Sequence, residues 1–417
     1  MSAKVRFIGL DVHKDTIVIA VAKAGDTPAE IWKTIPHDPG RLLRDLKRLG
    51  TLANMRVCYE AGPTGFGLQR FLEEHDVECQ VVAPSMVPVT SGSRIKTDRR
   101  DARNLAHFLR SGNLTPVWVP DEQTEALRDL ERARDDARIA ERRARQQLLK
   151  FLLRHDRRFT EGKHHWTQTH WRWILRQRFE LEALNRVLDD YVHAAQQAAE
   201  RVRRLNGDIA ELVEGWALAP LVKNLQALRG VELITGIGLA AEIGNFERFE
   251  KAKHFMAFVG LIPSEHSTGT KRRQGPITKT GNRHVRRLLL ESAWHYYNAP
   301  PGVSAVLQKR REGLSPEVVA IAEKAQRRLR RKAARMKAAG KLPNKIATAL
   351  ARELAGFVWA IARATEPVAA PSKAQDGESP RKGKAAGAAP GRSRRKETPR
   401  TGLSPNSRSR KEVPARA

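Results

Sequence analysis

The feature that most constrains the fold is an alternation of short β-rich runs with helical patterns over about the first 120 residues. The β-rich runs lie at residues 5–22, 56–62 and 78–85, and leucines at helical spacing occupy 41–50 and 68–76. The first run has DVHKD between two apolar halves, which predicts a hairpin. Strands alternating with helices of this length predict an α/β sheet domain.

The composition is strongly basic, with 76 Lys and Arg against 46 Asp and Glu, a formal net charge of +30. Such an excess favours a polyanionic partner, usually nucleic acid, and argues against a small-molecule metabolic enzyme. The two cysteines, Cys58 and Cys79, are too few for a disulfide scaffold or a multi-cysteine zinc module. The chain has no apolar run of about 18 residues and no signal-peptide pattern, so we expect a soluble, cytoplasmic protein without a membrane partner.

The character of the chain changes at about Asp121. Residues 121–215 combine leucines at helical spacing with charges of both signs, which predicts long helices arranged as a hairpin or a coiled coil. Such an arm could dimerise, hold nucleic acid or act as a structural spacer. The run HHWTQTHWRW at 164–173 matches no zinc-ligand spacing, so packing is the favoured interpretation of its His and Trp side chains.

Residues 216–365 are predicted to form a helical domain. Around 228–246 the pattern indicates a helix, a glycine-rich turn and a second helix, in which Gly236 and Gly238 would let backbone amides bind a phosphate, as in a helix–hairpin–helix. A tight turn between packed helices explains the same glycines. Residues 366–417 contain 13 Lys and Arg, 5 Asp and Glu and few large apolar residues, so we expect a disordered basic tail.

Four acidic residues stand out in this basic chain. Asp11 and Glu60 come at the ends of predicted strands, and Asp98 and Asp101 share one face of a helix predicted within 93–112. Together they could bind Mg²⁺ or Mn²⁺, and two such ions could hold the attacking and leaving oxygens of a phosphodiester. Alternatively, Asp98 is a helix N-cap and Asp101 a surface or ion-paired residue. The neighbouring bases that would attract a nucleic-acid backbone are Lys96, Arg99, Arg100 and Arg103.

A second candidate site is the loop HSTGTKRRQG, which contains Ser267 and Thr268. A hydroxyl in this loop could attack a phosphodiester, with nearby bases stabilising the developing charge. Passive phosphate binding or a simple turn would also explain a loop of this composition. The basic residues of the loop and of the following helix are Lys271, Arg272, Arg273, Lys279, Arg283, Arg286 and Arg287, and we expect them to contact nucleic-acid backbone.

Taken together, these motifs resemble those of a family of bacterial insertion-sequence transposases of the DEDD type. DVHKD, YEAGPTG and KTDRRDARNLA are similar to the family's N-terminal domain, which is RuvC-like, with an RNase H-type fold. The stretch from GIGLAAEIGNF through HSTGTKRRQG to RRLLLESAW is similar to its C-terminal transposase domain. The resemblance covers roughly residues 5–300, with both blocks in the family's order and spacing.

This resemblance implies an enzyme that recombines DNA, a transposase acting in the bacterial cytoplasm and associated with the nucleoid when on DNA. It implies that Asp11, Glu60, Asp98 and Asp101 hold Mg²⁺ in a composite site with the C-terminal domain of another subunit of a dimer or tetramer. It also implies a serine nucleophile and a structured non-coding guide RNA, the partner of an RNA-guided bridge recombinase. The family usually has serine directly before the glycine, where this chain has Thr268, so we expect Ser267 to be the nucleophile and Thr268 the alternative.

The expected architecture is therefore a RuvC-like domain at 1–120, a helical arm at 121–215, a helical transposase domain at 216–365 and the tail at 366–417. Two other functions remain open from the residues alone. A RuvC-like metal-dependent nuclease or junction resolvase would use the four carboxylates and water, without the serine loop. A non-catalytic nucleic-acid-binding protein would need only the charge, and its four acids would be dispersed.

Overall fold

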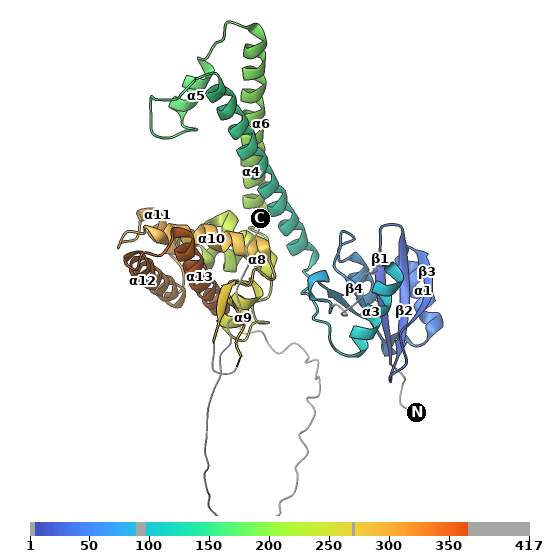
Figure 1. Ribbon diagram of the computed structural model, residues 1–417. Helices are drawn as coiled ribbons and strands as arrows, with labels where there is room; N and C mark the ends of the chain where they lie inside the picture. The colour runs from blue at the N-terminus through green and yellow to red at the C-terminus, as the bar shows by residue number, and fades with distance from the viewer. Residues whose placement is uncertain (1–4, 89–96, 269–271, 366–417) are drawn as a thin grey trace, which may run out of the picture. The chain divides into compact units, whose positions relative to one another are not determined.

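A computed structural model describes residues 5–88, 97–268 and 272–365 of the protein (Figure 1). The predicted tail, and Lys96 and Lys271 among the predicted nucleic-acid contacts, lie outside the described residues. Within the described part, the structure has a mixed five-stranded sheet near the N-terminus, followed by helices interrupted by one small two-stranded sheet. No helix of the described part is long and apolar enough to cross a membrane.

The N-terminal sheet has the strand order β3-β2-β1-β4-β5. Its strands are β1 (Arg6–Val12), β2 (Thr16–Lys23), β3 (Glu30–Pro36), β4 (Met55–Glu60) and β5 (Glu78–Val82). The hairpin predicted around DVHKD is confirmed, because β1 and β2 pair antiparallel on either side of it. Strand β1 pairs parallel with β4, and β4 pairs parallel with β5. The carboxyl ends of β1, β4 and β5 therefore meet at one edge of the sheet.

Helices cover both faces of this sheet. Helices α1 (Pro39–Leu49) and α2 (Gly67–Glu73) pack against one face, where Leu42, Leu46 and Leu72 join Ile8 and Leu10 in a buried core. Helix α3 (Asp98–Arg110) covers the other face through small apolar residues such as Ala102 and Ala106. Short 3₁₀ turns at Leu52–Asn54 and Pro84–Met86 complete the connections.

Helix α3 lies unusually close to the sheet because β1 carries a glycine beneath it. A Cβ atom on Gly9 would lie 2.2 Å from the Ala102 carbonyl oxygen and 2.4 Å from the Ala106 nitrogen. No side chain fits in that space, so glycine permits the helix backbone to approach the strand directly.

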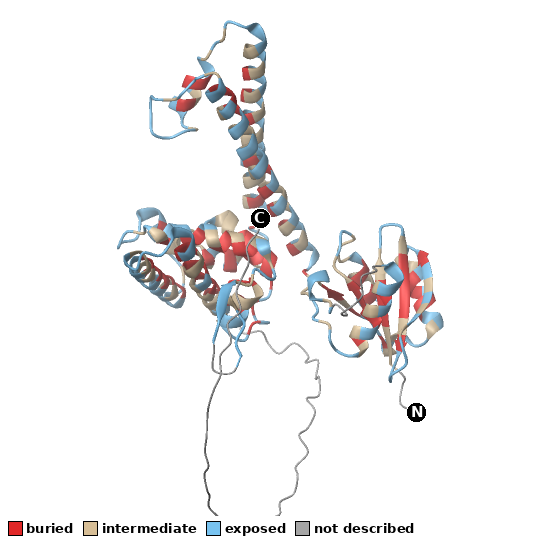
Figure 2. Ribbon diagram, viewed as in Figure 1, coloured by how far each residue is buried: buried red, intermediate tan, exposed pale blue. Residues whose placement is uncertain are grey.

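The helical arm predicted after Asp121 consists of α4 (Glu122–Arg154) and α6 (Glu182–Leu212), which pack against each other, with α5 (Gln168–Leu175) between them in sequence. Buried and exposed positions alternate along both long helices (Figure 2). His170 is buried and stacks on Trp173 at an interplanar angle of 13°. Burial lowers the pKa of His170 to about 4, so the ring is neutral at pH 7. Packing is therefore the role of this histidine, as the sequence indicates.

The C-terminal described part is a helical domain with one extensive apolar core. Its elements are α7 (Ala219–Leu225), α8 (Leu233–Ile243), α9 (Ala252–Phe258), β6 (Pro263–Glu265), β7 (Gln274–Ile277), α10 (Arg283–Tyr297), α11 (Ala305–Arg311), α12 (Pro316–Ala338) and α13 (Pro343–Thr365). Strands β6 and β7 form an antiparallel hairpin that contains the predicted serine loop.

The prediction of a glycine turn at 236–238 is wrong. Gly236 and Gly238 lie buried inside the continuous helix α8, so their amides are not presented to a phosphate from a turn. A Cβ on Gly236 would lie 3.2 Å from Val222 Cγ1, and one on Gly238 would lie 2.8 Å from Leu288 Cδ1. These glycines admit neighbouring helices, and the turn before α8 contains Gly230 instead, at φ 77°.

We predict that Gly9→Ala destabilises the N-terminal domain, because the methyl group would collide with the backbone of α3. Overpacking of this kind costs about 1–3 kcal/mol, measurable as a lower urea midpoint for unfolding. Gly67→Ala is the matched control, since Gly67 begins α2 and a Cβ there would meet no atom within 4 Å. Equal urea midpoints for the two variants would contradict the close packing of α3 on β1.

Candidate active site

The first part of the candidate site lies at the carboxyl end of β1 and β4. Leu10 of β1 pairs with Tyr59 of β4, so Asp11 and Glu60 follow at equivalent positions on neighbouring parallel strands. Side chains alternate between the faces of a sheet, and Leu10 and Tyr59 point into the core beneath α1 and α2. Asp11 and Glu60 consequently belong to the face that α3 covers.

Helix α3 brings two further carboxylates to this edge. Asp98 and Asp101 are in its first turn, where the partial positive charge of the helix N-terminus stabilises acidic side chains. Thr97 is the N-cap, and its hydroxyl oxygen accepts a hydrogen bond from the Arg100 amide at 3.4 Å. The alternative that Asp98 itself caps the helix is therefore wrong, and its carboxylate is left for other interactions.

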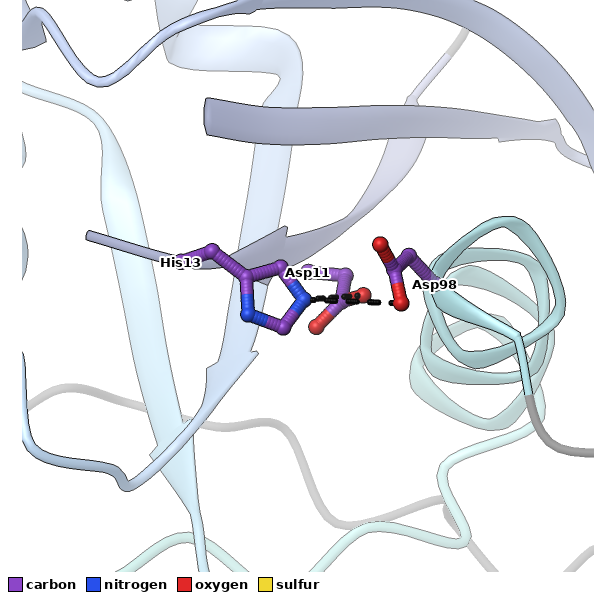
Figure 3. Close-up of side chains that lie close together, drawn as sticks. All are labelled: Asp11, His13 and Asp98. Carbon is purple, nitrogen blue, oxygen red and sulfur yellow. Dashed lines mark hydrogen bonds and ion pairs between the residues drawn. The ribbon is translucent and has the colours of Figure 1, made fainter. Parts of the chain in front are cut away.

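The structure brings Asp11 and Asp98 together around His13 (Figure 3). His13 Nε2 lies 3.2 Å from Asp11 Oδ2 and 3.6 Å from Asp98 Oδ1. One ligand atom from each of the three residues lies within 4.8 Å of the others, the spacing expected of groups that can share a metal ion. Within the described ranges, no other set of three His, Cys, Asp or Glu side chains meets this condition.

His13 is a site residue that sequence reasoning missed, although it lies in DVHKD. The available signal was its position two residues after Asp11, which places both side chains on the same side of an extended segment. The turn after β1 is held by the backbone, because the His13 amide donates to the Thr16 carbonyl at 2.9 Å. A ring nitrogen of His37, Nδ1, lies 2.5 Å from the His13 carbonyl oxygen.

Burial raises the pKa of Asp11 above its ordinary value, and the charges of Asp98 and Asp101 raise it further, against an opposing effect of His13. The ionised form of Asp11 is therefore disfavoured by partial burial and by repulsion from the neighbouring carboxylates. Carboxylate oxygens and an imidazole nitrogen at this spacing suit a divalent cation, which would relieve that repulsion. Asp101 is thus close enough to act electrostatically on Asp11, whereas Glu60 is placed at the same edge by strand register.

The second part of the candidate site is the β6–β7 hairpin. Ser267 and Thr268 are both exposed, but only the Ser267 hydroxyl has a hydrogen bond among the described contacts, which it donates to Glu265 Oε1 at 2.9 Å. The other oxygen of Glu265 accepts from the Arg272 guanidinium at 3.1 and 3.2 Å. Hydrogen bonds from Arg272, Ser267 and Gln274 lower the pKa of Glu265, so this carboxylate is ionised at neutral pH.

Glu265 was also missed at the sequence level, although it lies two residues before Ser267. Strand pairing explains its role, because Glu265 of β6 lies opposite Gln274 of β7 and next to the basic side of the hairpin. Of the two candidate hydroxyls, Ser267 is thus the one that the described contacts orient.

Arg286 is not a nucleic-acid contact, contrary to the sequence prediction. Its side chain is buried, and one guanidinium nitrogen donates to the Val259 carbonyl at 2.9 Å and to the Thr280 carbonyl at 2.8 Å. Arg286 thereby joins the chain on the two sides of the β6–β7 hairpin. Desolvation lowers its pKa from the ordinary value of an arginine, as expected for a guanidinium held inside the domain.

The remaining predicted cations differ in availability. Arg287 is half-buried and ion-paired with Asp135 at 2.8 Å and with Glu291 at 3.1 Å, and Arg272 is paired with Glu265. The predicted contacts whose residues are exposed are Arg99, Arg100, Arg103, Arg272, Arg273, Lys279 and Arg283.

Comparison with known proteins shows two family matches. Residues 222–308 match the family described as "Transposase IS116/IS110/IS902 family", and residues 8–155 match a transposase family of the DEDD type named for IS110. The first match contains the serine hairpin, and the second contains the strand-end carboxylates and α3.

Proteins that are similar over most of their length are also named as transposases. "Putative transposase y4qE" of Sinorhizobium fredii is 44% identical over 359 residues, 86% of this chain and 88% of the relative. "Transposase for insertion sequence element IS1533" of Leptospira borgpetersenii is 32% identical over 329 residues, 78% of this chain and 95% of the relative. With both domains matched and relatives similar over nearly the whole fold, the chain belongs to the IS116/IS110/IS902 family of insertion-sequence transposases.

Proposed function

We propose that this protein breaks and rejoins DNA strands at an insertion sequence, using the carboxylates around Asp11 to hold a divalent metal and Ser267 as the nucleophile. The observation that carries the proposal is the convergence of Asp11 and Asp98, from a strand end and a helix start, in a chain of net charge +30. An excess of positive charge attracts the DNA backbone, and a local cluster of carboxylates attracts the cations that phosphodiester chemistry uses.

Asp11 and Asp98 would hold the metal, with His13 Nε2 as a third donor and with Glu60 and Asp101 adding negative charge. Mg²⁺ or Mn²⁺ bound there would stabilise the charge that develops on phosphate oxygens. The carboxylates fit either ion, since both prefer oxygen ligands. Burial and the neighbouring carboxylates raise the pKa of Asp11, and a bound cation would oppose this effect by favouring the ionised form.

In the proposed reaction, the Ser267 oxygen attacks phosphorus and forms a serine–phosphate ester, while the bond from phosphorus to one bridging oxygen breaks. Glu265 orients the hydroxyl and accepts its proton as the new bond forms, and the departing oxygen takes a proton from water. Arg272 would hold Glu265 and place positive charge beside the phosphate. A hydroxyl of the second DNA strand would then attack the same phosphorus. The new phosphodiester would form as the bond from phosphorus to the serine oxygen breaks, and the serine would regain its proton.

We further propose that the enzyme acts as an oligomer, in which the acidic site and the serine hairpin of different subunits serve one phosphodiester. The family resemblance extends the proposal to a structured RNA from the element's non-coding end, and the large basic excess supports a second polyanionic partner. DNA at the element's ends and in the target would be the substrate.

The first prediction concerns stability and metal. A raised folded-state pKa means that Asp11 favours folding when protonated, and that this contribution is lost as pH rises through the folded pKa. Without metal, Asp11→Asn should therefore melt at or above the wild-type temperature at pH 7, with the difference shrinking toward pH 3. Differential scanning fluorimetry in EDTA measures this.

With bound metal, the wild type should melt at a higher temperature than Asp11→Asn. Saturating Mg²⁺ or Mn²⁺, at about 100 times the Kd, should stabilise the wild type by roughly 2.7 kcal/mol and leave Asp11→Asn nearly unchanged. Asp26→Asn is the control, because Asp26 is exposed in the connection between β2 and β3, away from the cluster. A metal shift of equal size in wild type and Asp11→Asn would contradict metal binding by Asp11.

The second prediction concerns the nucleophile. Protein incubated with Mg²⁺, element-end DNA and the flanking non-coding RNA should form a covalent protein–DNA adduct on a denaturing gel. Ser267→Ala and Asp11→Asn should reduce the adduct by at least about 100-fold, because each removes a group that takes a direct part in the proposed reaction. Glu265→Gln should reduce it more modestly, by about tenfold or more, through loss of the proton acceptor.

Thr268→Ala is the matched hydroxyl control and should keep most of the adduct. If Thr268→Ala lost the adduct and Ser267→Ala kept it, the nucleophile would be Thr268. Cleavage without any adduct, unaffected by both hydroxyl variants, would show instead a nuclease that uses water.

A further inference from the structure

Helix α12 carries a cationic face that none of the sites above uses. In its second half, basic residues recur at spacings of three and four, which places them on one side of a helix. The exposed members are Lys324, Arg327, Arg328, Arg331 and Arg335, with Lys332 half-buried at the margin. We refer to these six residues as the α12 basic face.

The core of the domain fixes the direction of this face. On its opposite side, α12 buries Val318, Ala322, Ala325, Leu329 and Ala333 in the apolar core shared with α10 and α13. Because the helix cannot rotate without exposing these residues, the α12 basic face is held rigidly toward solvent. A rigid charged surface loses less conformational entropy on binding than a flexible one.

Two acidic neighbours pair with three of the six residues of the α12 basic face. Glu353 of α13 pairs with Arg328 at 2.7 Å and with Lys332 at 2.5 Å, and Glu323 pairs with Arg327 at 3.3 Å. Lys324, Arg331 and Arg335 have no ion pair among the described residues. Lys324 and Arg328, and likewise Arg331 and Arg335, are like charges four residues apart, an arrangement that destabilises an isolated helix. A polyanion along this side would convert that repulsion into attraction.

The dimensions and chemistry favour duplex nucleic acid. From Lys324 to Arg335 the face extends over about 16 Å at a rise of 1.5 Å per residue, which corresponds to about five base pairs at 3.4 Å each. Single-stranded nucleic acid is usually held by aromatic side chains on which bases stack, and α12 has no aromatic residue. Cations without aromatic partners bind the phosphate backbone without reading bases.

We propose that the α12 basic face is a docking surface for the phosphate backbone of duplex DNA, independent of sequence and separate from the reacting phosphodiester. This proposal rests on the proposed function only in its choice of DNA, and not RNA, as the duplex. The surface would hold a stretch of duplex, and Lys324, Arg331 and Arg335 would make the phosphate contacts.

The test is binding of the full chain to a 30-base-pair random duplex, measured by fluorescence anisotropy in EDTA at 50–200 mM salt. Lys324→Gln/Arg331→Gln/Arg335→Gln should weaken binding at least tenfold at 50 mM salt. Loss of three phosphate contacts should also reduce the steepness of log affinity against log salt by about 2.7. Between 50 and 200 mM salt, the Kd of the wild type should therefore rise about 40-fold more than the Kd of the triple variant.

The matched control is Arg201→Gln/Arg203→Gln/Arg204→Gln, which removes three exposed cations of α6 and causes the same change in net charge. It should change affinity and salt slope much less. Arg331→Lys/Arg335→Lys keeps the charges and should bind within about threefold of wild type, which separates charge from helix integrity. Because the binding assay contains EDTA and measures no strand cleavage, failure of the chemistry and failure of this surface are distinguishable.

Three results would overturn the proposal: equal losses in the α12 and α6 triple variants, an unchanged salt slope in the α12 variant, or a loss seen only with an RNA hairpin of the same length. The last result would assign the surface to RNA.

Discussion

The close packing of α3 on β1 is the contact on which the acidic site depends. Gly9 leaves no side chain between the strand and the helix, so the first turn of α3 reaches the end of β1. Asp98 and Asp11 then both lie close to His13 Nε2, at 3.6 and 3.2 Å. A larger residue at position 9 would move the helix, and with it the second carboxylate. The glycine is therefore a requirement of the site as well as of the fold.

Charge has opposite signs at two scales in this protein. Over the whole chain the surplus is positive, which suits a polyanionic substrate. At the end of β1 the local charge is negative, and burial makes it costly, as the raised pKa of Asp11 indicates. In the proposed reaction both would be used, because the positive surplus would attract DNA and the carboxylates near Asp11 would attract the cation. At the serine hairpin a single carboxylate is paired with a cation: Glu265 accepts hydrogen bonds from the Ser267 hydroxyl and from Arg272, which keep it ionised.

Sequence patterns predicted the elements that follow a clear period, and these include the parts that carry the carboxylates. Strands β1, β2, β4 and β5 and helices α1, α2 and α3 are where the patterns place them. Strand β3 was missed because it is an edge strand whose apolar residues, Ile31, Trp32, Ile35 and Pro36, come in adjacent pairs and do not alternate with polar ones. His13 was missed because its role depends on where Asp98 arrives from another element, and sequence spacing does not contain that information.

Two errors have a common cause. Gly236 and Arg286 were interpreted as contacts to phosphate because of their residue types, but Gly236 lies buried inside α8 and Arg286 donates hydrogen bonds to backbone carbonyls of its own domain. A glycine that admits a neighbouring helix and a glycine that forms a turn look alike in one sequence, as do a buried and an exposed arginine. Burial, which decides between the two roles, is a property of the tertiary fold.

The central claim, that Asp11 and Asp98 form a divalent metal site, can be tested most directly by crystallography with Mn²⁺ and anomalous scattering. The account predicts an anomalous peak between the two carboxylates, at oxygen distances of about 2.0–2.6 Å, that is absent in crystals of Asp11→Asn. Crystals saturated with Mn²⁺ that show no peak between Asp11 and Asp98, or the same peak in Asp11→Asn, would contradict it.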